Sequence, residues 1–191
     1  MYLKRSLGDL LDEIGAPTPV PGSGSVAAVV VALAAAVVAM AARISGPVWE
    51  EAAGFAAQAE TLRLRATRLA QLDAERYEQA LSALAAPGDG RPELRDFALG
   101  RAVAQAAEPP VEIVEAAFDV AVLAEEIARR GDPTVRADAA AAACVAAGAG
   151  RAAAELVAIN LTARPGDERV NRMRRLADKA ADAARRTLVS E

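Results

Sequence analysis

The chain has 191 residues, 53% of them hydrophobic and only 3% aromatic, which indicates one folded domain with a sizeable core. Its formal net charge of -4 argues against a nucleic-acid-binding surface. The absence of histidine and the single cysteine, Cys144, exclude histidine-based catalytic triads, His-ligated zinc and an intramolecular disulfide.

The first predicted helix covers Leu3 to Ile14, where leucines recur at helical spacing. The next nine residues, APTPVPGSG, predict an extended, turn-rich loop, because prolines block helix and sheet pairing. A helix follows from Val26 to about Ile44, with Ser25 as its N-cap. Its apolar run is short and alanine-rich for a membrane span, so we expect a fully buried helix rather than a membrane-associated one.

Further helices are predicted at about residues 50–86, 92–107, 111–130, 136–161 and 168–188, with turns at the intervening Pro and Gly residues. The helix at 136–161 holds an uncharged run from Ala139 to Gly150 and is the second buried helix. No strand pattern or dividing linker occurs in the sequence. We therefore predict a single all-α domain over residues 1–191, a helical bundle with two nearly uncharged central helices wrapped by amphipathic helices.

The arginines near the C-terminus alternate with acidic residues, which is typical of a solvated helix face, and we expect no nucleic-acid and no membrane partner. The N-terminal segment carries charges and has no continuous apolar stretch before residue 25. No signal peptide is predicted, and a cytoplasmic location is expected.

The loop residues Gly22, Ser23, Gly24 and Ser25 precede a buried helix. A helix start offers unpaired N–H groups and a positive dipole end, so this loop can hold an anion or a developing oxyanion. A capping turn without a ligand would have the same sequence, and the pattern alone leaves both interpretations open.

Several segments, in order and spacing, resemble the formimidoyltetrahydrofolate cyclodeaminase/methenyltetrahydrofolate cyclohydrolase family. They are PVPGSGSVAA at residues 19–28, LDAERY at 72–77, AAEPPVEI at 106–113, GDPTVRAD at 131–138 and AINL at 158–161. Two positions depart from the family pattern: Ser23 stands where a glycine is usual, and Ala137 where a serine is usual.

The resemblance implies an enzyme of folate one-carbon metabolism that forms a homodimer and uses no metal or redox cofactor. A cyclodeaminase converts 5-formiminotetrahydrofolate to 5,10-methenyltetrahydrofolate and ammonia, whereas a cyclohydrolase opens the methenyl ring with water to 10-formyltetrahydrofolate. The sequence does not separate these two activities. The alternative is a non-catalytic module on the same scaffold that binds folate or a protein.

Two carboxylates are the candidate catalytic groups. Asp138 opens a nearly uncharged helix and can orient the pterin or accept a proton from N10; helix capping is its structural alternative. Asp73 can be the second carboxylate: if the two share a partly desolvated pocket, the pKa of one is raised and it can donate a proton to departing ammonia. Its alternative is an exposed residue paired with Arg76, three positions further along the helix.

Three further positions complete the candidate substrate-binding set around the Gly22–Ser25 loop. Tyr77, one turn after Asp73, can stack on a pterin, although a core position is slightly favoured. Arg136 can bind the carboxylates of the glutamate tail, or be an ordinary surface arginine. Asn160 can orient the ligand or cap the end of its helix. Cys144 is expected to be an inert core thiol.

Overall fold

The computed structural model describes residues 6–85, 92–161 and 167–188. Within these ranges every regular element is helical, and no strand occurs. The elements are α1 (Leu7–Gly15), α2 (Ser23–Ser45), α3 (Ala52–Ala85), α4 (Pro92–Ala106), α5 (Glu108–Arg130), the 3₁₀ helix η2 (Pro133–Val135), α6 (Arg136–Asn160) and α7 (Glu168–Leu188). The predicted all-α bundle is confirmed.

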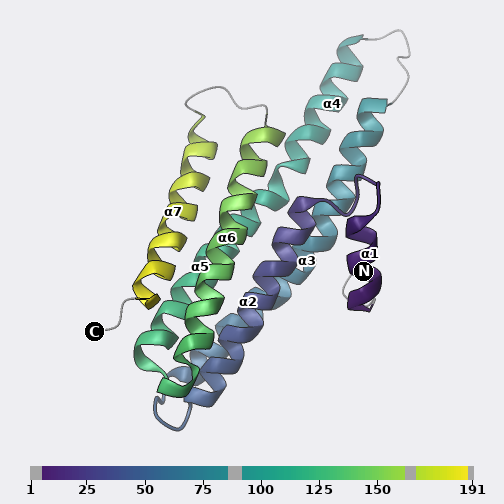
Figure 1. Cartoon of the computed structure of the whole chain (residues 1–191). Coiled ribbons are helices and arrows are strands. Elements are labelled where there is room, and N and C mark those ends of the chain that lie inside the picture. The colour runs from purple at the N-terminus through teal and green to yellow at the C-terminus, as the bar shows by residue number, and fades with distance from the viewer. Residues whose placement is uncertain (1–5, 86–91, 162–166, 189–191) are drawn as a thin grey trace.

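The long helices run side by side, with α2 packed against both α3 and α6, and α5 packed against α6 and α7 (Figure 1). The end of α3 and the start of α4 project beyond the other helices, and short α1 lies beside α2 (Figure 1). Consecutive helices α2 and α3 are antiparallel because only a few residues join them. The end of α2 also lies beside the segment that precedes α6, because Ser45 accepts a hydrogen bond from Asp132, so the start of α2 and the end of α6 lie toward the same end of the bundle.

The predicted helix boundaries agree with the structure to within four residues. One prediction about a boundary is wrong: α2 begins at Ser23 with Gly22 as its N-cap, so Ser25 lies inside the first turn. The predicted loop at 87–90 and most of the turn at 164–167 fall outside the described residues.

Alanine allows the helices of the core to approach closely. Ala28, Ala35 and Val38 of α2 are fully buried. A Cβ built on Gly150 of α6 would lie 3.0 Å from the Cβ of Ala117 on α5, which is tighter than ordinary van der Waals contact. The core of this aromatic-poor chain therefore consists of small side chains, which are packed densely because the helices lie close together.

The two uncharged helices are buried on one side only. Leu33 of α2 is 60% exposed and Val145 of α6 is 46% exposed, so the full burial expected for residues 26–42 is not met. The segments Ser23–Ser45 and Pro133–Asn160 are long and apolar enough to cross a membrane by length and composition, with 61% and 50% of their most apolar windows buried inside the fold. Such helices also form the cores of soluble proteins.

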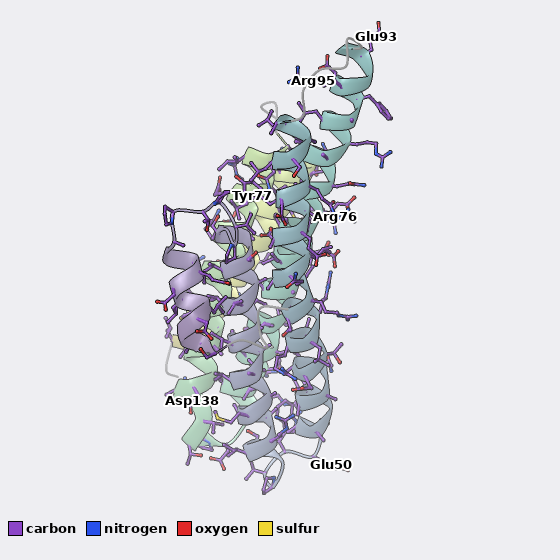
Figure 2. The ribbon with its side chains drawn as sticks, turned by 90° about the vertical axis from the view of Figure 1, so that its right-hand side faces the viewer. Glu50, Arg76, Tyr77, Glu93, Arg95 and Asp138 are labelled. Carbon is purple, nitrogen blue, oxygen red and sulfur yellow. The ribbon has the colours of Figure 1, made fainter. Side chains whose placement is uncertain are left out.

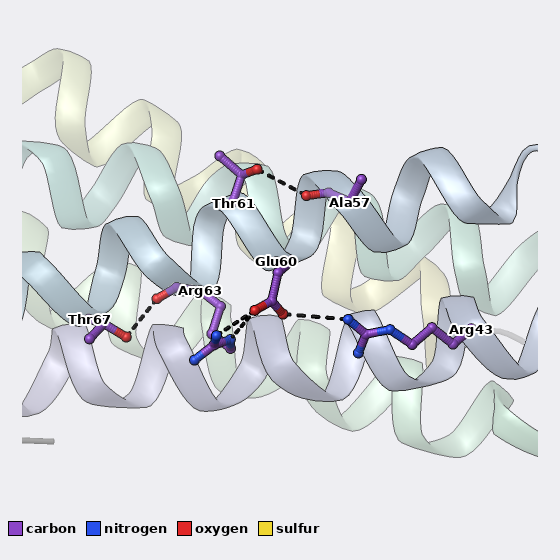
Figure 3. Close-up of polar contacts among 6 residues, drawn as sticks. All are labelled: Arg43, Ala57, Glu60, Thr61, Arg63 and Thr67. Carbon is purple, nitrogen blue, oxygen red and sulfur yellow. Dashed lines mark hydrogen bonds and ion pairs between the residues drawn. The ribbon is translucent and has the colours of Figure 1, made fainter. Parts of the chain in front are cut away.

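An ion pair joins α2 to α3 near the far end of α2, beside polar contacts within α3 (Figure 3). Glu60 of α3 forms ion pairs with Arg63 on its own helix and with Arg43 of α2, the latter at 3.6 Å. The hydrogen bond from Arg63, with the nearby positive charges, lowers the pKa of Glu60. Thr61 and Thr67 donate hydrogen bonds to carbonyls one turn earlier, those of Ala57 and Arg63, as Figure 3 shows.

Trp49 and Cys144 occupy different environments. Trp49 is buried, packs against Phe55 with ring centroids 4.6 Å apart, and receives the Arg130 guanidinium 4.5 Å from its ring centroid. Trp49 therefore connects the turn after α2 to Phe55 of α3 and to Arg130 at the end of α5. Cys144 is exposed, so its predicted core position is wrong, because the alanine-rich run around it is covered on one side of α6 only.

Candidate functional site

The first turn of α2 encloses the carboxylate of Asp73, which extends from α3 and is only 8% exposed. The Ser25 hydroxyl donates a 3.0 Å hydrogen bond to Oδ2 of Asp73. A Cβ on Gly24 would lie 2.2 Å from Oδ1 of the same carboxylate. Gly24 is therefore a glycine because the carboxylate occupies the space of any side chain at that position.

The surroundings of Asp73 favour its protonated form. Burial raises the pKa of Asp73, and hydrogen bonds from the Ser25 hydroxyl and backbone N–H lower it in part. Among the described residues, no lysine or arginine pairs with this carboxylate. The N–H group of Ser25 in the first turn of α2, at the positive end of the helix dipole, donates to it instead. A carboxyl group held in this way can donate and accept a proton near its site.

The loop before α2 carries the other predicted binding residues. Gly22 is half-buried, and Ser23 is exposed at the first position of the helix. Pro21 is buried and follows a cis peptide bond with Val20. Gly22 makes no side-chain cap; the Asp73 carboxylate accepts the hydrogen bond of the Ser25 N–H in the first turn instead, so the negative charge predicted at this helix start is supplied by the chain itself.

Tyr77 and Arg76 follow Asp73 along α3. Tyr77 is 38% exposed, so the core position favoured for it is wrong, and its stacking on a ligand stays a prediction (Figure 2). Arg76 bonds Gln79 at 3.1 Å and Gln105 at 3.5 Å. The alternative interpretation of Asp73, an exposed partner of Arg76, is also wrong.

Asn160 ends α6 and donates a 3.2 Å hydrogen bond to the carbonyl of Ala106, the last residue of α4. It therefore caps a neighbouring helix and not its own. The side chain is half-buried, and its role toward a ligand stays a prediction.

Arg136 and Asp138 are exposed in the first turn of α6, and Asp138 lies far from Tyr77 (Figure 2). The turn before them is anchored to the last residue of α2: Ser45 accepts a 2.9 Å hydrogen bond from the Asp132 N–H. Asp132 in turn accepts hydrogen bonds from the hydroxyl and N–H of Thr134, which lower its pKa.

One chain does not bring the two predicted catalytic carboxylates together. Ser25 holds Asp73 at the start of α2, whereas Ser45 holds the segment leading to Asp138 at its end. At 1.5 Å per residue, these two serines are about 30 Å apart along the helix. The sequence pattern could not reveal this separation, because it follows from the antiparallel packing of α2 and α6.

The larger cavity of the structure does not lie at the Gly22–Ser25 loop, where the binding site was predicted. A groove of about 680 Å³ between α3 and α5 is lined by Arg65, Arg68, Leu69, Gln71, Leu72, Glu75 and Glu112. It was not predicted, because its residues are spread over two helices without a local motif. The space beside Ser25 is about 10 Å³ and is closed by Leu10 and Ile14 of α1, far below the ~300 Å³ of a typical ligand pocket. Across the described ranges, no group of three or more Cys, Asp or Glu side chains is arranged to hold a metal ion.

Comparison with known proteins gives two results. A family model described as formiminotransferase-cyclodeaminase matches residues 6–179. The solved structure of formiminotetrahydrofolate cyclodeaminase from Thermotoga maritima is similar, with a TM-score of 0.83 and 23% sequence identity, over 98% of this chain and 96% of that one. None of the curated proteins matches the chain.

Proposed function

This chain belongs to the formiminotransferase-cyclodeaminase family, and on that basis we propose that it converts 5-formiminotetrahydrofolate to 5,10-methenyltetrahydrofolate and ammonia. Hydrolysis of 5,10-methenyltetrahydrofolate to 10-formyltetrahydrofolate, which passes through a similar tetrahedral carbon, is the second activity to assay. The observation that carries the proposal is the buried Asp73 carboxyl group at the start of α2, beside Gly24 and Ser25.

The proposed reaction requires two proton transfers. N10 attacks the formimino carbon bound to N5 and gives a tetrahedral carbon that carries an amino group. A base takes the proton from N10, an acid protonates the amino group, and the bond between carbon and the amino nitrogen breaks as ammonia leaves. No oxidation state changes, so the reaction needs no redox cofactor, and side chains can carry both proton transfers, so we propose that it also uses no metal.

Asp73 fits the role of the acid in this scheme. Burial raises its pKa, so its proton is retained at a pH where an exposed aspartate is ionised. We propose Asp138 as the base, or as the group that orients the pterin. The proposed binding residues are the Gly22–Ser25 loop for the reacting one-carbon unit, Tyr77 for stacking, and Arg136 and Asn160 for the remaining polar groups of the folate.

We also propose an oligomeric state, a location and a partner class for this activity. The exposed apolar sides of α2 and α6 favour a homodimer. Because a second copy would cover these surfaces, we propose that the protein has no membrane role and acts in the cytoplasm on a soluble folate, without a nucleic-acid partner.

The test follows the methenyltetrahydrofolate chromophore in parallel reactions that start from 5-formiminotetrahydrofolate and from 5,10-methenyltetrahydrofolate. Each reaction is compared with one that lacks protein. Faster appearance in the first identifies a cyclodeaminase, and faster loss in the second, with 10-formyltetrahydrofolate as product, identifies a cyclohydrolase. If neither rate exceeds its control, the enzyme proposal fails and a non-catalytic binding module takes its place.

A further inference from the structure

The Asp73 carboxyl group is enclosed on the side of α1. Asp73 and its hydrogen-bond donor Ser25 are both buried. The space beside Ser25 is about 10 Å³, which is room for about one water molecule at most. A folate of several rings does not fit into this space. In this conformation the ligand reaches the carboxyl group only if part of the surrounding wall moves.

Three elements and one loop form the wall of this space. It is lined by Leu10 and Ile14 of α1, Pro21 of the loop, Ser25, Val26 and Val29 of α2, and Ala70 of α3. The helices α2 and α3 pack against each other in the bundle, and Ala70 is buried between helices there. Moving either of them would open the core.

The α1 helix is the part of the wall that moves at the lowest cost. It is short and lies beside α2 at the edge of the bundle (Figure 1). Leu10 is the one buried residue of Leu7–Gly15, whereas Leu7 and Leu11 are exposed. Elements with few buried apolar contacts open locally while the rest of the protein stays folded.

The connection of α1 to the bundle permits such a movement. Residues 16–21 contain three prolines, which restrict the backbone of the loop. Within the loop, the Thr18 hydroxyl donates a 3.2 Å hydrogen bond to the Val20 carbonyl. Gly15 ends α1 and is exposed, with nothing within 4 Å of a Cβ built on it, and Gly22 precedes α2. Rotation is therefore concentrated at these two glycines, as at the hinges of other moving elements.

We propose that α1 is a lid, which swings away from the start of α2 to admit the folate to Asp73 and Ser25 and returns after the product has left. The inference rests on the proposed function and adds a conformational step to it. Leu10 holds the lid closed, because it is the one side chain of α1 that the fold buries. A single buried leucine favours the closed state without preventing local opening.

Amide hydrogen exchange measures this opening without a ligand. The amides of α1 should exchange much faster than those of α2 and of α3 around Ala70. Leu10→Ala removes the buried contact and should raise the exchange rates in α1 about tenfold or more. Leu11→Ala is the matched control, because it makes the same change in the same helix at a 58% exposed position. It should alter these rates by no more than about twofold.

A reversible cross-link tests whether turnover needs the opening. Ile14→Cys and Val29→Cys, on either side of the space beside Ser25, are combined in a Cys144→Ala background, because Cys144 is exposed and would react. A short bis-methanethiosulfonate reagent joins the two thiols and holds α1 closed. Activity with 5-formiminotetrahydrofolate should be lost and should return when dithiothreitol releases the bridge. The same protein treated with methyl methanethiosulfonate, which caps the thiols without joining them, should stay active.

Two results would overturn the lid and leave the proposed function intact. One is a set of α1 amides that exchange as slowly as those of α2, with no difference between Leu10→Ala and Leu11→Ala. The other is a bridged protein with full activity. An inactive wild type on both folate substrates overturns the proposed function instead, and the exchange rates then still decide whether α1 opens.

Discussion

Replacing Gly24 by alanine is the sharpest structural test of the site. The new Cβ would lie 2.2 Å from Oδ1 and 2.6 Å from Cγ of Asp73, so the carboxylate must move by about 1 Å to restore van der Waals contact. That movement breaks the 3.0 Å hydrogen bond from Ser25. The buried carboxyl group would then lose its only side-chain donor among the described residues.

The magnitude follows from three contributions. Overpacking a buried position costs about 1–3 kcal/mol, and losing a hydrogen bond to a charged or buried group costs about 1.5–3 kcal/mol. Alanine gains about 1 kcal/mol over glycine in helix propensity. We therefore expect Gly24→Ala to lower the free energy of unfolding by about 3 kcal/mol and to lower activity.

The assay is denaturant unfolding followed by circular dichroism, with Gly100→Ala as the matched control. Gly100 also lies within a helix, but a Cβ there would meet nothing within 4 Å, so this change should stabilise the protein by about 0.5–1 kcal/mol. If both variants are equally stable, Asp73 does not occupy the space above Gly24 and the description of the site is wrong.

Three further predictions concern other parts of the structure. Because burial raises the pKa of Asp73, the folded chain keeps a proton that the unfolded chain loses above about pH 4; the free energy of unfolding of wild type, relative to Asp73→Asn, should fall as pH rises from there through the folded pKa. A pH series in which that difference is constant or rises would contradict the raised pKa. Ser45→Ala leaves the Asp132 N–H without its partner and should cost about 1–3 kcal/mol in a denaturant titration; no loss would show that the anchor contributes nothing. Trp49→Ala empties a buried site and should cost about 3–5 kcal/mol, whereas Trp49→Phe keeps a ring there and should cost much less. Thermal unfolding distinguishes the two, and equal losses would exclude a packing role.

The sequence predicted the helices well, because prolines and glycines punctuate them and apolar residues recur at helical spacing. It also predicted Asp73 and the Gly22–Ser25 loop as site residues; the structure places Ser25 against Asp73, and their catalytic role stays a prediction. The N-cap was misplaced from Gly22 to Ser25, because a serine before an apolar run is the usual cap. Here the Ser25 hydroxyl bonds a carboxylate on another helix instead.

The sequence could not predict which side of each uncharged helix is buried and which is exposed. When every position in a run is apolar, periodicity does not tell which side faces the core. Leu33 and Cys144 are exposed for this reason. The separation of Asp73 from Asp138 likewise depends on which helices are neighbours and on their direction, which local sequence does not encode.

The most direct test of the central claim compares kcat and KM of wild type and Asp73→Asn with 5-formiminotetrahydrofolate. Asparagine keeps the shape of the side chain and can accept the hydrogen bond from Ser25, but it cannot donate the proton of a carboxylic acid. We predict that kcat falls by about 10²–10⁴-fold with little change in KM, as expected for the loss of a general acid. An Asp73→Asn protein with wild-type kcat would contradict the assignment of this buried carboxyl group to catalysis.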